Sequence, residues 1–166
     1  MLAMRPLADA EVGQVLRANQ PGAAPAAIAQ GVALAEGRPR RGFEALAMAG
    51  ESTVAALKAW LTAPLSGPST LHLGLADALM ADAASSEATF ARDIVLDWLA
   101  GEARHAAIAG SSARRRLASA NELWDKAQAL FADADSLNLD ARQTLVTILD
   151  GIRRHARRTA QISELT

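Results

Sequence analysis

Cysteine and tyrosine are both absent from this chain of 166 residues, and aromatic residues make up only 4% of it. Without cysteine there is no disulfide framework, no thiolate nucleophile and no thiolate metal site, which fits a reducing cytoplasm. No stretch reaches the roughly 18 to 20 uninterrupted apolar residues of a membrane span, and the start of the chain lacks the pattern of a secretion signal. We therefore expect a cytoplasmic protein without a membrane partner.

An excess of charge of either sign is also lacking: charged residues make up 21% of the chain, but the formal net charge is only −1. No global field attracts the chain to nucleic acid, so any such binding has to come from a local cluster. Hydrophobic residues make up 51% of the sequence, mainly as alanine and leucine, and β-branched residues never form the alternating runs of a half-buried strand. This composition predicts an all-α fold.

Three short helices are expected in the first fifty residues. The first follows Asp9 as its N-cap, the second starts at Pro25 and ends at Gly37 in a left-handed conformation, and the third follows Pro39 and stops at Gly50. The apolar rhythm lengthens after Gly50. We therefore place a domain boundary there, with one module over residues 1–50 and a second over 51–166.

The second module is expected to hold five helices, and the last of these has the clearest start. Asp140 is placed to accept from the backbone N–H of Gln143 while the Gln143 side chain reaches back, as in a capping box. Leu137 and Leu139 precede this cap and are expected to anchor the turn. No internal repeat is visible, so repeat architectures have no support.

Signals for chemistry are few. Glu102 and His105 have the E-x-x-H spacing that metal-binding bundles use, but the residues three before His72 and His155 are not acidic, so we expect a surface ion pair and no metal. The sequence contains no phosphate-binding loop and no nucleophile elbow. Nothing in it brings serine, histidine and aspartate together, so we expect no cofactor and no enzymatic activity.

Basic residues gather at a few places. Those at the start of the third helix are positioned either to contact a phosphate or to form solvated or ion-paired turns: Arg38, Arg40 and Arg41. A second group on the last helix is expected on one side, facing nucleic-acid backbone, an acidic partner or only solvent: Arg153, Arg154, Arg157 and Arg158. A third run comprises Arg114, Arg115 and Arg116. No aromatic residues stand between these arginines to stack on bases.

The order of these signals resembles the delta-prime subunits of the bacterial DNA polymerase III clamp loader, which are relatives of the AAA+ family. Three segments carry the resemblance: Arg5-Pro-Leu7 leading into the first helix, Gly37-Arg-Pro-Arg-Arg-Gly-Phe43, and Asn138-Leu-Asp-Ala-Arg-Gln143. In the second segment, Gly42 and Phe43 stand where alanine and leucine are commoner. The matched positions are mostly helix caps, so the resemblance depends on their order along the chain.

The resemblance implies a three-helix lid followed by a five-helix collar that holds the loader pentamer together, without catalysis of its own. The implied partners are the gamma/tau and delta subunits and, indirectly, the sliding clamp and primer-template DNA. Arg40 falls in the register of the AAA+ sensor arginine, but delta-prime subunits have typically lost nucleotide binding. The resemblance also implies a fragment that begins at the lid. The alternative is a helical adaptor domain that binds nucleic acid through the arginines of the last helix.

Overall fold

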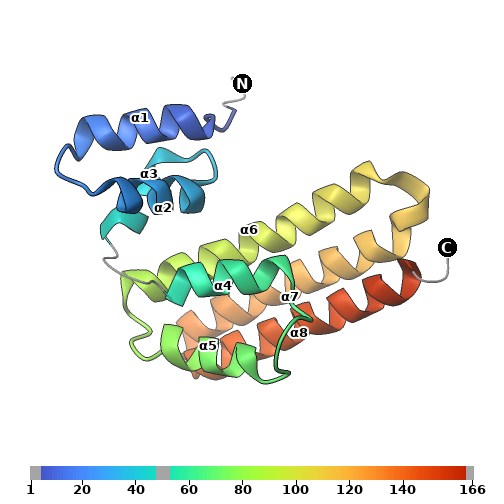
Figure 1. The fold of residues 1–166 in the computed structure, drawn as a ribbon. Helices are drawn as coiled ribbons and strands as arrows, with labels where there is room; N and C mark the ends of the chain where they lie inside the picture. The colour runs from blue at the N-terminus through green and yellow to red at the C-terminus, as the bar shows by residue number, and fades with distance from the viewer. Residues whose placement is uncertain (1–4, 48–52, 164–166) are drawn as a thin grey trace. The chain divides into compact units, whose positions relative to one another are not determined.

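The fold is all-helical wherever the structure, a computed structural model, describes the chain, over residues 5–47 and 53–163 (Figure 1). This confirms the all-α prediction. The chain divides into two compact units, residues 1–55 and 56–166, and each is described by itself. The boundary expected at Gly50 lies outside the described residues, so the division into modules at that point stays a prediction.

The first unit packs three helices around a small apolar core. They are α1 (Asp9–Asn19), α2 (Pro25–Ala35) and α3 (Pro39–Ala47). The core consists of Val12, Leu16, Ile28 and Ala35, with partly buried side chains around it from Ala23, Val32, Phe43 and Leu46. α2 and α3 lie close together where Gly31 has no side chain: a Cβ added at Gly31 would lie 3.2 Å from the Gly42 carbonyl oxygen. Small residues thus set the spacing of this unit.

The helix ends of the first unit depart from expectation at one place. The N-cap of α1 is Ala8, in extended conformation, and Asp9 is the first helical residue. The Ala8 backbone N–H donates to Glu11 Oε2 at 2.8 Å, so the carboxylate three residues into the helix replaces the expected cap. α2 begins at Pro25 as predicted, and both Glu36 (φ +50°) and Gly37 (φ +76°) are left-handed after its end.

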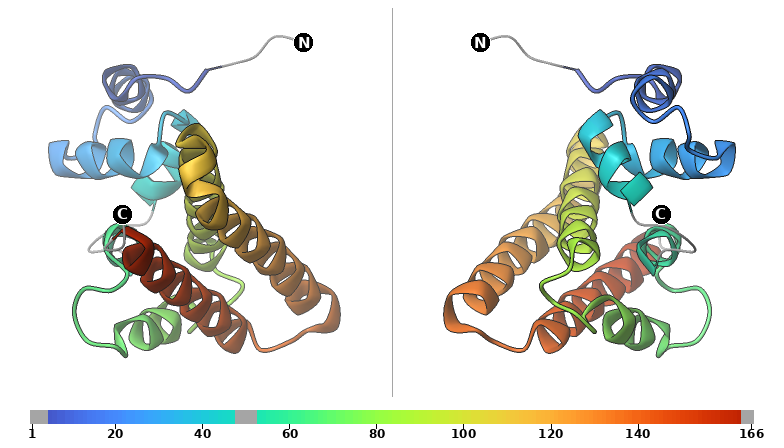
Figure 2. Two further views of the ribbon diagram at one scale, coloured as in Figure 1. Left: turned by 90° about the vertical axis from the view of Figure 1, so that its right-hand side faces the viewer. Right: turned by 90° about the vertical axis from the view of Figure 1, so that its left-hand side faces the viewer.

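The second unit contains most of α4 (Thr53–Thr62) together with α5 (Leu71–Leu79), α6 (Ser86–Ile108), a 3₁₀ turn η1 (Gly110–Ala113), α7 (Arg114–Leu137) and α8 (Ala141–Ser163). α6 packs on α7 and α7 packs on α8, so the three long helices form an antiparallel set (Figure 2). α5 packs against α8. Within residues 5–47 and 53–163, no helix combines the length and the hydropathy needed to cross a membrane.

The core of the second unit is built on α8. Its buried face consists of Leu145, Ile148, Leu149 and Ile152, each no more than 1% exposed. Their three- and four-residue spacing is that of one helix face, as the sequence predicts. The other helices contribute further buried apolar side chains, among them Leu57, Leu61, Leu79, Phe90, Ile94, Val95 and Leu99.

The turn between α7 and α8 confirms one part of the sequence prediction and contradicts another. Asn138 ends α7 in the left-handed conformation (φ +53°), and the Gln143 backbone N–H donates to Asp140 Oδ1 at 2.9 Å. Asp140 is therefore the N-terminal cap of α8. Leu137 and Leu139 do not anchor the turn, because they are 66% and 48% exposed. The two caps fix the turn, and these leucines remain on the surface.

Gly37 is a position of the first unit where a side chain would not fit. Its φ of +76° is strained for any residue with a Cβ, and that Cβ would lie 2.6 Å from Pro6 Cβ and 2.7 Å from the Leu7 carbonyl oxygen. The Leu7 backbone N–H also donates to the Gly37 carbonyl oxygen at 2.9 Å. The segment before α1 is thus seated on the turn before α3.

Replacing Gly37 by alanine should therefore destabilise the chain by about 1 to 3 kcal/mol, because backbone has to move in addition to the left-handed strain. Gly22→Ala is the matched control, since nothing lies within 4 Å of its added Cβ, and it should change stability by less than about 0.5 kcal/mol. Urea unfolding followed by circular dichroism measures both. Equal stability of the two variants would contradict the contact described here.

Candidate functional site

The three arginines at the start of α3 do not form one binding site. Arg40 is on the surface, its side chain 92% exposed, and its Nε lies 3.0 Å from Glu44 Oε1 one turn later. Arg41 is buried, with Nη1 3.7 Å from Glu36 Oε2. Arg38 is exposed. The three guanidinium groups therefore lie in different surroundings. Arg40 and Arg41 form ion pairs, which was one of the alternatives that the sequence left open.

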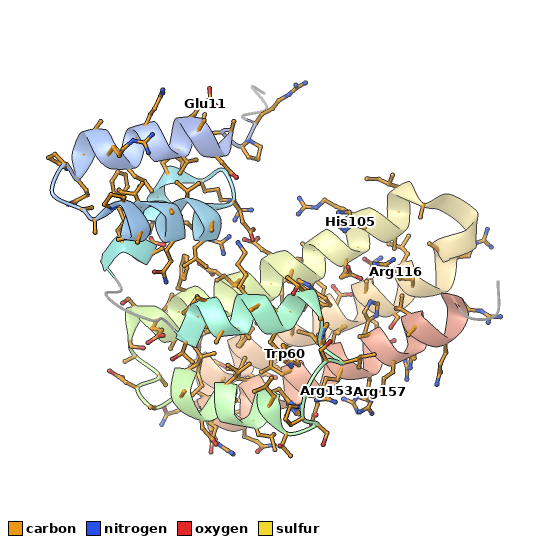
Figure 3. The ribbon with its side chains drawn as sticks, viewed as in Figure 1. Glu11, Trp60, His105, Arg116, Arg153 and Arg157 are labelled. Atoms are coloured by element: carbon orange, nitrogen blue, oxygen red, sulfur yellow. The ribbon has the colours of Figure 1, made fainter. Side chains whose placement is uncertain are left out.

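The arginines of α8 also separate, which corrects the expectation of one four-residue basic face. Arg153 is buried, and its Nη1 donates to the Ser69 carbonyl oxygen at 2.8 Å in the loop between α4 and α5. Arg154, Arg157 and Arg158 are exposed. Figure 3 shows Arg153 and Arg157 about one turn apart on the helix. Arg153 points inward because the loop carbonyls need a hydrogen-bond donor, and the apolar side chains of α8 have none to offer.

A polar cluster inside the second unit joins three helices. The carboxylate of Glu102 on α6 accepts from Arg116 Nη2 on α7 at 2.8 Å, and its Oε2 lies 3.4 Å from His155 Nε2 on α8. His155 Nδ1 lies 3.0 Å from Ser119 Oγ on α7. The His155 side chain is 3% exposed and meets the Trp98 ring edge-on, with centroids 6.5 Å apart. The cluster is thus largely shielded from water.

The hydrogen bonds of this cluster keep the Glu102 carboxylate ionised. Hydrogen bonding from His155, and then from Arg116, lowers the pKa of the Glu102 carboxyl to about 2, although burial acts in the opposite direction. Because Glu102 is ionised, the facing Nε2 of His155 carries a hydrogen, and in the neutral ring Nδ1 accepts from the Ser119 hydroxyl. The imidazole is thereby held in one orientation and one tautomer.

Sequence reasoning missed this cluster. It paired Glu102 with His105, one turn along the same helix, but Glu102 faces the other helices and His105 is exposed (Figure 3). Its true partners are 14 and 53 residues away in the sequence. No local pattern predicts such a contact, and only the buried register of α8, which places His155 three residues after Ile152, hinted that this histidine points inward.

The order serine, histidine, carboxylate resembles the arrangement of a hydrolytic triad, but the surroundings differ from one. Ser119 lies within α7, where backbone N–H groups are used by the helix itself and none is left to hold an oxyanion. Arg116 also neutralises the carboxylate that would have to stabilise an imidazolium ion. We therefore interpret the cluster as a polar contact that aligns α6, α7 and α8.

Two further polar pairs tie helices of the second unit together. His72 on α5 is buried, its Nε2 lies 2.9 Å from Asp150 Oδ1 on α8, and its ring stacks on Trp60 of α4 with centroids 6.0 Å apart. Arg92 on α6 holds both carboxylate oxygens of Asp135 on α7, at 2.8 and 2.7 Å. This contact lowers the pKa of Asp135 and raises that of Arg92. Both pairs are structural.

A cavity of about 200 Å³ opens between α7 and α8 beside the polar cluster. Its lining is Ser119, Glu122, Leu123, Lys126, Gly151, Arg154, His155 and Arg158. Two of the exposed arginines of α8 therefore belong to a concave site, and Arg157 does not. Across the described ranges, no three His, Cys, Asp or Glu side chains come close enough together to hold a metal ion.

Comparisons with protein-family models, with curated proteins and with solved structures found no match for this chain.

The depressed pKa of Glu102 predicts a specific acid dependence of stability. A carboxyl whose pKa falls from 4.5 to about 2 on folding stabilises the protein above pH 4.5, and this contribution is lost as pH falls toward 2. Because Arg116 is one-third exposed and water screens it, we expect Glu102→Gln to cost about 1 to 2 kcal/mol at neutral pH.

Urea unfolding at neutral pH and at pH values through this window measures the effect. The difference between Glu102→Gln and the parent should shrink as the pH is lowered. Glu122→Gln is the control, because this exposed carboxylate of α7 has the same chemistry without an ion pair. A constant difference at every pH would contradict the assigned role of the Glu102 charge.

Proposed function

We propose that this chain is a non-catalytic structural part of a bacterial DNA polymerase III clamp loader, with residues 1–50 as a delta-prime-like lid and residues 51–166 as its collar. In this role the second unit associates with the gamma/tau and delta subunits and contributes to assembly of the pentamer. Its connection to the sliding clamp and to primer-template DNA is indirect, through the assembled loader.

The observation that carries the proposal is a contact between two of the three segments that resemble the family. Pro6 and Leu7 of the first segment lie against Gly37 of the second, and the Leu7 backbone N–H donates to the Gly37 carbonyl oxygen. Residues matched separately, Leu7 and Gly37, thus serve one local structure although they are far apart in the sequence. Such a shared contact is a physical reason for both segments to keep their pattern.

The third segment has a comparable structural reason. Asn138, Asp140 and Gln143 form the turn between α7 and α8, with Asn138 left-handed and Asp140 capping the next helix. Next to it, Arg142 forms an ion pair with Asp77 of α5. Helices of 24 and 23 residues meet at this turn, and their length is suited to presenting an extended side surface to a neighbouring subunit.

Arg40 has no part in this proposal as a nucleotide contact. It lies in the register of a sensor arginine, but its guanidinium is on the surface and engaged by Glu44. We accordingly assign no cofactor and no catalytic step to the chain.

The second candidate, a nucleic-acid adaptor, rests on the three exposed arginines of α8. The burial of Arg153 weakens it, because one of the four expected cations contacts a loop of the same chain. Exposed charges also commonly face only solvent. The structural role in a loader is the better supported of the two because it draws on both units.

Mixing the chain with purified gamma/tau and delta subunits tests the proposal. We expect co-elution in size-exclusion chromatography that persists when salt is raised, since apolar collar contacts respond weakly to salt whereas phosphate contacts weaken steeply. Leu149→Asp is the negative control, because a charge at this fully buried position should disrupt the bundle and abolish co-elution. Failure of the parent chain to associate with either subunit would overturn the proposal.

A further inference from the structure

The cavity between α7 and α8 is lined by a glycine of α8, Gly151, and by the buried His155. Gly151 has no side chain, and a Cβ there would lie 2.6 Å from Leu123 Cδ1. Leu123 Cδ1 therefore lies close to the α8 backbone at Gly151, and both residues line the cavity. One wall is His155, a buried ring held by Glu102 and Ser119, so its position is fixed before any ligand arrives.

The rim of the cavity carries uncompensated positive charge. Lys126 comes from α7, and Arg154 and Arg158 follow each other by one turn on α8. Among the residues that the structure describes, none of these three cations has an ion-pair partner. Glu122 is the single carboxylate in the lining, so the rim has a formal charge of about +2 with histidine neutral. Like charges at this spacing repel, and an anion between them removes that cost.

From the fixed wall and the positive rim we propose that this cavity binds a phosphate group. Guanidinium groups donate two parallel hydrogen bonds to phosphate oxygens, and the lysine ammonium adds a point charge. The Ser119 hydroxyl lines the same space and donates its hydrogen to His155 Nδ1, so it positions the imidazole beside the ligand. The apolar side chain of Leu123 favours an esterified phosphate, whose organic part lies against it.

Size is compatible with this ligand class. A volume of about 200 Å³ equals about seven water molecules at roughly 30 Å³ each. That is enough for a five-atom phosphate and part of the group esterified to it. It is too small for a nucleic-acid duplex, so a polymer would offer the cavity one backbone phosphate at a time. A free phosphate ester and a single strand thus share the chemistry proposed here.

Titration of the whole chain with inorganic phosphate, followed by amide chemical shifts in NMR, tests the site. We expect saturable shifts at Ser119, Leu123, Gly151 and His155, and no such shifts with chloride at equal ionic strength. Arg154→Gln and Arg158→Gln should each weaken binding by about tenfold, as loss of one charge-assisted contact implies.

Arg157→Gln is the matched control. It removes the same charge from the same helix, and its side chain is exposed but does not line the cavity. Its binding should stay within about twofold of the parent, the small change expected when only a distant screened charge is lost. No saturable shifts, or equal weakening in all three arginine variants, would overturn the proposal in favour of a diffuse basic surface.

A short single-stranded DNA is the second probe and identifies the source of the phosphate. If DNA competes with inorganic phosphate and loses affinity in Arg154→Gln but not in Arg157→Gln, the source is a nucleic-acid backbone. If inorganic phosphate binds and DNA does not, the source is a small phosphorylated molecule. Either result supports the pocket. The proposal is independent of assembly with loader subunits, so each of the two ideas can fail while the other stands.

Discussion

Burial of one face of α8 is the constraint on which the second unit depends. Leu145, Ile148, Leu149 and Ile152 lose almost all contact with water there. Full burial of such side chains contributes about 1.5 to 3 kcal/mol each, so this face outweighs any single ion pair in the chain. A 3.6-residue period then dictates which neighbours of these residues point inward and which point outward. The locations of His155, Arg153 and the cavity-lining arginines all follow from this one register.

Apolar burial alone leaves the sliding and rotation of helices poorly determined, since many registers bury similar area. The polar contacts supply what it lacks. Arg153 reaches loop carbonyls before α5, Asp150 meets His72 on α5, and His155 meets groups on α6 and α7. Each contact requires one alignment of two elements, because a slip of one residue would leave a buried donor or charge unpaired. Three such contacts between positions 150 and 155 of α8 align it with α5, α6, α7 and the loop before α5.

The helices could be predicted from the sequence, but the polar contacts between them could not. The difference lies in how far apart in the sequence the interacting residues are. Helix starts at Pro25 and Asp140 and the left-handed Gly37 depend on residues within one turn, and these predictions hold. Two errors are local, namely the cap of α1 and the exposed Leu137 and Leu139; the others occur where a neighbour distant in sequence decides the outcome. Arg153 and Arg154 are adjacent and identical, yet one is buried and one exposed, because only the first faces the loop after α4. The polar cluster was missed for the same reason: its carboxylate and imidazole meet only after three helices are packed.

The helix dipole stabilises basic residues near the C-terminal end of a helix, but it does not explain the arginines of α8 that line the cavity. The favourable effect of the negative helix end on cations is confined to the last turn. α8 continues to Ser163, so Arg154 lies more than two turns before its end and Arg158 more than one. Neither charge is stabilised in this way, and neither has a carboxylate partner in the described part of the chain. Their placement one turn apart beside a fixed imidazole and a lysine from α7 therefore carries a net electrostatic cost in the isolated chain. A bound anion relieves that cost without any change in the packing of α7 against α8.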